Sequence, residues 1–223
     1  ADYAGRGVIE AIGTGIDFKD GDLALRGNFS TLDEKDIIID RRAGRHIERE
    51  DAKAVSEEIE QKLKFSNQLA TVIVSPTIGH RVIVRIRDEH PLSPNITNTD
   101  PAYSRVDGMG GAKAGGAFPK IERCLPLDET DASKLSAKLV NEFTEKSLEI
   151  LKESEINKKR NSQGKKLLNS ILLRDAGNKY PKVETINAKY SMNFSCIVDM
   201  PVEIGISNVL EMKPYSAGGL TDY

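Results

Sequence analysis

Metal-binding and redox motifs are absent from this sequence of 223 residues. Its two cysteines, Cys124 and Cys196, lie far apart and form no C-x-x-C pair, and its three histidines, at positions 46, 80 and 90, lack the spacing of metal ligands. There is also no Walker loop, no G-x-G-x-x-G and no H-E-x-x-H. We therefore expect reduced cysteines and no metal or other cofactor bound by this chain, which excludes a two-metal hydrolytic centre within it.

Long apolar runs and an excess of positive charge are absent as well. No run approaches the roughly 18 to 20 apolar residues that a membrane span requires. The 32 Lys and Arg residues against 34 Asp and Glu give a net charge of −2, which disfavours a nucleic-acid partner held by bulk electrostatics. With 39% hydrophobic and 30% charged residues, the composition predicts a globular cytoplasmic protein without a nucleic-acid or membrane partner. The sequence does not specify an oligomeric state.

Apolar periodicity predicts strands that alternate with helices. We expect strands at 22–29, 37–40, 71–74, 82–86, 170–173 and 194–198, and helices from the start of the chain to residue 12, at 49–64, at 131–154 and at 201–210. Gly13 and Gly15 are expected to end the first helix. This order predicts an α/β or α+β fold with a mixed β-sheet and flanking helices.

Short turns predict how the strands pair. The strands at 22–29 and 37–40 are separated by a Leu-Asp-Glu-Lys-Asp turn and are expected to form a hairpin, as are those at 71–74 and 82–86. Residues 91–118 show no periodicity and are rich in Pro, Asn, Thr and Gly. So long a stretch within a compact domain is usually functional or mobile.

Three arginines occupy similar places in the predicted elements. Arg26, Arg87 and Arg174 each lie at or near the end of an apolar strand and are followed by small or turn residues. Strand ends that open into loops are common ligand sites in α/β folds, and the planar guanidinium group can donate two parallel hydrogen bonds to a carboxylate or phosphate. The pattern fits either an anion-binding site or ordinary surface ion pairs.

A second group of candidate residues lies in turns and loops. Arg41, Arg42 and Arg45 place three cations on one turn, which is unfavourable unless an anion or carboxylates neutralise them, although a solvated basic turn is equally consistent. His80 could act as a hydrogen-bond donor or proton carrier near neutral pH, or have a structural role. Asp100 precedes a proline, which marks a turn, but opposite the arginines it could accept a proton from a substrate hydroxyl.

Several segments carry a more specific signal when they are taken together. The chain reads AGRGVIEAIG at 4–13, GDLALRGNFST at 21–31, DRRAGR at 40–45, HR at 80–81 followed by Arg87, NTDP at 98–101, LLRDAG at 172–177 and GGLTDY at 218–223. In the same order, these segments resemble the PGRG-x-x-E-A-x-G, GD-x-A-x-R-x-NF-x-T, DRRAGR, HR…LR, TDTDP, LLRGAG and TGG-x-DTDY segments of the archaeal-type cofactor-independent (2,3-bisphosphoglycerate-independent) phosphoglycerate mutases. The resemblance extends from one end of the chain to the other.

The resemblance implies a two-part enzyme of the alkaline phosphatase superfamily. A core domain would carry a phosphoserine nucleophile and two divalent metals (manganese, magnesium or zinc), and an inserted domain would hold the phosphoglycerate while 3-phosphoglycerate and 2-phosphoglycerate interconvert. The nucleophile and metal ligands would lie outside this chain, which we expect to be an inactive fragment. Residues 1–20 would belong to the core domain, 21–200 to the inserted substrate-binding domain, and 201–223 to the segment that returns to the core.

The resemblance also implies roles for individual residues. Six arginines would bind the carboxylate and phosphate of the substrate: Arg26, Arg41, Arg42, Arg45, Arg87 and Arg174. Asn28 and His80 would assist, and Asp100 would accept a proton. Two positions depart from the family pattern. Asp175 stands where the family usually has Gly and places a negative charge beside Arg174, and Asn98 stands where it usually has Asp, which leaves Asp100 as the better candidate base.

Two other functions remain open at this point. One is a small-molecule kinase or phosphotransferase of the same superfamily, similar to the proposed homoserine kinases, which would use another acceptor. The other is a non-catalytic anion-binding or interaction domain.

Overall fold

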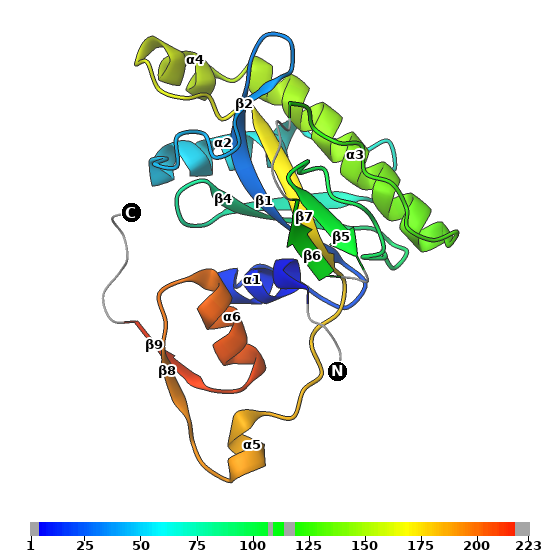
Figure 1. Cartoon of the computed structure of the whole chain (residues 1–223), viewed down its shortest axis with the longest axis vertical. Helices are drawn as coiled ribbons and strands as arrows, with labels where there is room; N and C mark the ends of the chain where they lie inside the picture. Colours follow the sequence, from blue (N-terminus) through cyan, green and yellow to red (C-terminus); the bar gives the residue numbers. More distant parts are fainter. Residues whose placement is uncertain (1–4, 107–108, 114–118, 217–223) are drawn as a thin grey trace.

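The computed structural model shows a five-stranded antiparallel sheet with helices packed on both faces (Figure 1). It describes residues 5–106, 109–113 and 119–216. The sheet contains β1 (Leu23–Leu32), β2 (Ile38–Asp40), β3 (Thr71–Pro76), β4 (Arg81–Arg87) and β7 (Ser170–Gly177). The strands run in the order β2-β1-β4-β3, and β7 also pairs with β1. The expected class, a sheet with flanking helices, is confirmed, and so are the two expected antiparallel pairs, β1 with β2 and β3 with β4.

One face of the sheet forms the main hydrophobic core. Alternate residues of β1, namely Leu23, Leu25 and Phe29, point to this face, because successive side chains of a strand point to opposite sides. They pack with apolar residues of α2 (Arg49–Lys62) and α3 (Asp131–Lys152), which confirms both expected helices. Gly27 lies on the same face, where a Cβ atom would approach Val82 to 2.9 Å, so only glycine lets the strands pack this closely.

The opposite face of β1 carries a mixture of apolar and polar side chains. Ala24 packs with Ile83 under Val8 and Ala11 of α1 (Arg6–Thr14) in a small second core. The same alternation that places Leu25 in the main core places Arg26 and Asn28 on this second face, beyond the helix. A polar patch therefore lies within the sheet rather than at its edge.

The first helix packs against α6 (Pro201–Val209), on the side of α1 away from the sheet (Figure 1). A Cβ atom on Gly13 would lie 1.7 Å from the Pro201 carbonyl oxygen, and one on Gly205 would lie 1.9 Å from the Ile9 carbonyl oxygen. Gly13 was expected to end the helix, which is wrong: the helix continues to Thr14, and Gly15 caps it with a φ of 72°. Contact with α6, not helix termination, accounts for glycine at position 13.

Other elements extend or add to the expected ones. The helix α4 (Glu155–Ser162) occupies a segment with no predicted element, and its buried Arg160 pairs with Glu48 and Asp51 at the start of α2. Two short strands, β5 (Tyr103–Val106) and β6 (Met109–Ala112), form a hairpin where only a loop was expected. The rest of the elements are α5 (Ile186–Tyr190), β8 (Ser195–Ile197) and β9 (Lys213–Tyr215).

The strands β8 and β9 form a separate parallel pair, so parallel pairing occurs outside the five-stranded sheet. The expected strand at 194–198 and helix at 201–210 are confirmed within one residue at each end. The motif at 218–223 lies outside the described residues, and the expected division at residues 20 and 200 stays a prediction. None of the helices in the described ranges combines the length and apolar character needed to cross a lipid bilayer.

Candidate anion-binding site

The register of three strands brings several predicted site residues onto one face of the sheet. Arg26 lies opposite Arg174 in the β1–β7 pairing, and Asn28 lies opposite Arg81 in the β1–β4 pairing. Residues directly opposite in an antiparallel pair share a face. The expectation that Arg26 and Arg174 lie at strand ends is wrong, because both strands continue beyond them, to Leu32 and Gly177.

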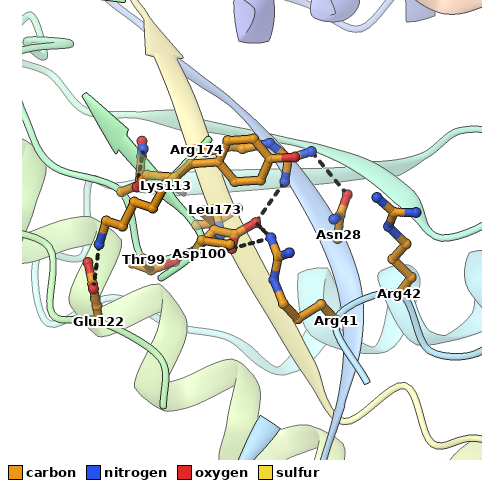
Figure 2. Close-up of polar contacts among 12 residues, drawn as sticks. Asn28, Arg41, Arg42, Thr99, Asp100, Lys113, Glu122, Leu173 and Arg174 are labelled. Carbon is orange, nitrogen blue, oxygen red and sulfur yellow. Dashed lines mark hydrogen bonds and ion pairs between the residues drawn. The ribbon is translucent and has the colours of Figure 1, made fainter. Parts of the chain in front are cut away.

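Arg174 joins a network with an acidic residue of the loop and a second arginine (Figure 2). Its Nη1 donates to Oδ2 of Asp100 at 3.0 Å, and its Nη2 donates to Oδ1 of Asn28 at 3.4 Å. Arg41, from the turn after β2, donates from Nη2 to both oxygens of Asp100 at 2.7 and 2.9 Å. One carboxylate therefore holds two guanidinium groups that come from different elements.

Backbone contacts with β7 fix the position of Asp100. The N–H groups of Thr99 and Asp100 both donate to the Leu173 carbonyl, at 2.9 and 3.0 Å, and the Leu173 N–H donates to Thr99 Oγ1 at 2.9 Å. Asp100 is fully buried, and its Oδ1 also accepts from the Ala102 N–H at 3.2 Å. Both carboxylate oxygens are thus occupied by donors of the protein itself.

Arg26 has a different counter-ion. Its Nε lies 3.0 Å from Oε1 of Glu10, a buried residue of α1 that also accepts from Arg6 at 2.7 Å. The Arg26 Nε makes an ion pair but no well-aligned hydrogen bond. Burial lowers the pKa of Arg26 to about 10, and the charge of Glu10 opposes this shift. Arg26 remains a cation near neutral pH.

The turn that follows β2 presents three arginines around a hollow of about 500 Å³. Asp40 holds the turn by accepting the N–H groups of Arg42 and Gly44 at 2.8 and 3.0 Å. Ala43, Gly44 and Arg45 all have positive φ values, of 43°, 82° and 69°, which is unusual for residues other than glycine. Within the described part of the chain, the side chains of Arg42 and Arg45 make no hydrogen bond or ion pair.

The pKa of His80 reflects the positive charge of this region. Burial, together with the positive charges of nearby arginines, lowers the pKa of His80 to about 4 from its ordinary 6.5. The arginines responsible, in order of effect, are Arg81, Arg42, Arg174 and Arg26. Cations from the turn and from three strands of the sheet therefore act on the same point, and they keep the imidazole neutral at physiological pH.

Arg87 lies apart from this group. It follows Arg81 by six residues along β4, which corresponds to about 20 Å of extended strand. Its guanidinium donates to both oxygens of Asp22 at 2.7 Å and to Asp17 at 2.7 Å, and these bonds raise its pKa above the ordinary value for arginine. The structure thus brings Arg26, Asn28, Arg41, Arg42, His80, Asp100 and Arg174 together, leaves Arg45 exposed on the rim, and places Arg87 in an ion-pair network elsewhere.

The two departures from the family pattern have defined contacts. Asp175 Oδ2 lies 3.7 Å from Arg174 Nε, so its charge acts on that arginine without a hydrogen bond. Asp175 also has a positive φ of 57°, next to the irregularity in the β1–β7 register. Asn98 donates from Nδ2 to the Tyr103 carbonyl at 3.2 Å and so links two parts of the loop.

Sequence reasoning missed three residues of the site. Arg81 was noted only beside His80, although its place opposite Asn28 puts it on the same face of the sheet as Arg26 and Arg174. These residues (Arg26, Asn28, Arg81 and Arg174) form the arginine face of the sheet. Glu10 belongs to the first motif and supplies the carboxylate for Arg26. Tyr103 is an aromatic residue in a loop of small and polar residues, and its ring lies next to two guanidinium groups, those of Arg41 and Arg174. An aromatic residue in such a loop is a signal that could have identified Tyr103 from the sequence.

Among the described residues there is no group of three or more His, Cys, Asp or Glu side chains placed to hold a metal ion. The divalent metals that the resemblance implies therefore have no ligand set among these residues. The arrangement is instead suited to an anion, because guanidinium groups outnumber carboxylates around the hollow.

Comparison with known proteins agrees with the sequence resemblance. The profile of a family described as 2,3-bisphosphoglycerate-independent phosphoglycerate mutase matches residues 1–157. The chain is 39% identical over 223 residues to a protein of that name from Pyrobaculum aerophilum; the match includes 98% of this chain and 50% of that protein. It is 38% identical over 211 residues to one from Aeropyrum pernix, where the match includes 93% of this chain and 49% of that protein.

A solved structure gives a similar result. The cofactor-independent phosphoglycerate mutase from Thermoplasma acidophilum matches 97% of this chain with a TM-score of 0.66 and 29% identity, while the chain covers 53% of that protein. The chain thus spans about half the length of the curated relatives and of the structure that it matches.

Proposed function

The chain belongs to the 2,3-bisphosphoglycerate-independent phosphoglycerate mutase family, and we propose that within an enzyme of this family it binds and orients phosphoglycerate. The proposed site consists of the arginine face of the sheet and the turn after β2. Phosphoglycerate carries a carboxylate and a phosphate ester on different carbon atoms. A site that binds both groups therefore requires cations at more than one place.

The observation that supports this proposal most directly is the surplus of guanidinium groups near His80. Arg42 has no carboxylate partner among the described residues, and the same holds for Arg81, whose Nη1 donates to the Met200 sulfur at 4.0 Å. Arg41 and Arg174 share the Asp100 carboxylate, and Asp175 lies 3.7 Å from Arg174 Nε without a hydrogen bond. Like charges gathered in a partly buried place are unfavourable, and a bound polyanion would remove that cost.

The positions of the cations suit a ligand with charge at both ends. Arg41 and Arg42 come from the turn, whereas Arg174 comes from the sheet (Figure 2). Arg81 also comes from the sheet, so a glycerate between the turn and the sheet could contact both groups. Each guanidinium can donate two parallel hydrogen bonds to a carboxylate or phosphate, which fixes the orientation of the ligand as well as its affinity.

In the proposed reaction, 3-phosphoglycerate and 2-phosphoglycerate interconvert through a phosphoserine on the part of the enzyme that this chain does not span. Two divalent metals in that part would stabilise the charge on the transferred phosphoryl group. The contribution of this chain would be to hold the glycerate so that either hydroxyl can be presented to the phosphoserine. We expect the 223-residue chain alone to bind the substrate without converting it. If ³¹P NMR shows that the chain alone interconverts the two phosphoglycerates, the proposed assignment of binding to this chain and of phosphoryl transfer to the rest of the enzyme is wrong.

Asp100 has two possible roles in this scheme. As a proton acceptor it would need a free oxygen toward the substrate hydroxyl, and both oxygens are now occupied by Arg41, Arg174 and the Ala102 N–H. As a counter-ion it would hold the two arginines without further change. The contacts favour the counter-ion role in the free chain, and a proton-accepting role would require one guanidinium to move to the bound ligand.

Isothermal titration calorimetry with 3-phosphoglycerate tests the proposal. We expect measurable binding by the 223-residue chain and affinity at least about tenfold weaker in Arg42→Met, because a hydrogen bond to a charged group contributes about 1.5 to 3 kcal/mol. Arg123→Met is the matched control, because Arg123 is exposed and pairs with the exposed Glu145 at 3.5 Å. Equal affinity in all three proteins would support an interaction domain that does not bind the substrate through these arginines.

A further inference from the structure

The ring of Tyr103 contacts both of the arginines that share Asp100. The Cζ atom of Arg174 lies 4.5 Å from the centre of the ring, and the Cζ atom of Arg41 lies 5.5 Å from it. Both distances are within the range in which a cation is attracted to the negative face of an aromatic ring. Asp100 and Tyr103 thus contact the same pair of guanidinium groups.

The pairing of Arg41 with Arg174 needs more than one attractive partner. Two like charges held on one carboxylate repel each other, and the repulsion grows as water is excluded. Asp175 Oδ2, 3.7 Å from Arg174 Nε, offsets part of this repulsion, but it lies too far away to form a hydrogen bond and does not hold Arg41. An aromatic ring attracts both cations through its quadrupole and leaves their charge in place.

The backbone specifies where the Tyr103 ring lies, independently of the arginines. The Tyr103 N–H donates to the Asp100 carbonyl at 3.3 Å, and the Tyr103 carbonyl accepts from Asn98 at 3.2 Å. Tyr103 also pairs with Ala112 across the β5–β6 hairpin. Arg41 and Arg174, in contrast, belong to the turn after β2 and to β7. The ring therefore connects three parts of the fold.

We propose that Tyr103 is a positioning residue that holds Arg41 and Arg174 at a fixed spacing, so that together they receive one anionic group of the ligand. The inference rests on the proposed function, because it assumes that this pair faces phosphoglycerate. The tyrosine hydroxyl makes no hydrogen bond within the described part of the chain, so the ring rather than the hydroxyl carries the role.

Two variants separate the ring from the hydroxyl. Tyr103→Phe keeps the ring, and we expect its affinity for 3-phosphoglycerate in calorimetry to stay within about twofold of the unmodified chain. Tyr103→Leu removes the ring, and we expect affinity about tenfold weaker. Tyr215→Leu is the control, because Lys213 lies 5.0 Å from the centre of that exposed ring, far along the chain from the arginine face.

A second readout does not depend on the ligand. Protons of Arg174 next to the ring should show a ring-current shift in NMR spectra of the free chain, which Tyr103→Phe keeps and Tyr103→Leu loses. If the unmodified chain binds no 3-phosphoglycerate, the proposed function is wrong, and the ring-current shift then decides on the positioning role alone. Equal arginine spectra in the unmodified chain and Tyr103→Leu, or equal loss of affinity in the Phe and Leu variants, would overturn the role assigned to the ring.

Discussion

Arg26 and Arg174 lie directly opposite each other across β1 and β7, yet each is neutralised by a carboxylate from a different element. Glu10 of α1 pairs with Arg26, and Asp100 of the loop after β4 pairs with Arg174. The two cations can share one face because a helix and a loop each supply a negative charge from its own side. This arrangement makes the stability of the sheet depend on residues that also belong to the proposed site.

Replacing Asp100 should destabilise the chain strongly. Asp100→Asn removes the carboxylate that Arg41 and Arg174 share and leaves Arg174 with the longer contact to Asp175, at 3.7 Å. Breaking a buried ion pair on one side costs about 3 to 5 kcal/mol. The free energy of unfolding, measured in urea, should fall by about this amount. Asp36→Asn is the control, because Asp36 is exposed and its pair with Lys152, at 3.2 Å, contributes little. A change no larger than in the control would show that Asp100 does not act as the counter-ion.

Replacing Arg87 should affect stability and leave ligand binding intact. Arg87→Met removes the partner of the buried Asp22 carboxylate, and we expect the free energy of unfolding to fall by about 1 to 3 kcal/mol. The affinity for 3-phosphoglycerate should stay within about twofold, because Arg87 lies about 20 Å along the strand from Arg81. Calorimetry on the folded variant checks this, and a large loss of affinity would return Arg87 to the site.

Stability should decrease as the pH falls from about 6.5 toward 4, in part because of His80. The folded chain holds the pKa of His80 at about 4, below the ordinary 6.5, so the unfolded chain binds more protons in this interval. Unfolding is therefore favoured as the pH falls, and the contribution vanishes above pH 6.5, where both states are neutral. Urea midpoints at pH 7 and pH 5 should differ less in His80→Asn than in the unmodified chain. His90→Asn, at an exposed position, should leave the difference unchanged.

The contact between α1 and α6 should not tolerate a methyl group at position 205. In Gly205→Ala the new Cβ would lie 1.9 Å from the Ile9 carbonyl oxygen, so the two helices must move apart. We expect the free energy of unfolding to fall by about 1 to 3 kcal/mol, the usual cost of overpacking. Gly111→Ala is the matched control, because a Cβ there meets no atom within 4 Å. If both variants have the same melting temperature, the helices pack less tightly than the structure shows.

The sequence by itself determined the order and type of most elements and the family resemblance. Apolar periodicity located β1, β3, β4, α2 and α3 because burial of one face leaves a period of two or 3.6 residues in the chain. The predicted strands singled out Arg26, Arg87 and Arg174 as candidate anion ligands, and the three cations on one turn singled out Arg41, Arg42 and Arg45. Local pattern could not show, however, which of the arginines meet.

Only the tertiary structure decided those partners, because each depends on residues far apart in the chain. Arg41 and Arg174 reach Asp100 across 59 and 74 positions, and no local period encodes such pairs. Arg87 looked equivalent to Arg174 in the sequence, but strand register places it in a separate ion-pair network with Asp22. The sequence predicts that Gly13 ends the first helix, whereas in the structure Gly13 lies inside that helix and allows α6 to pack against it. Local sequence specifies which face of an element is buried, whereas packing of the whole chain specifies what lies against that face.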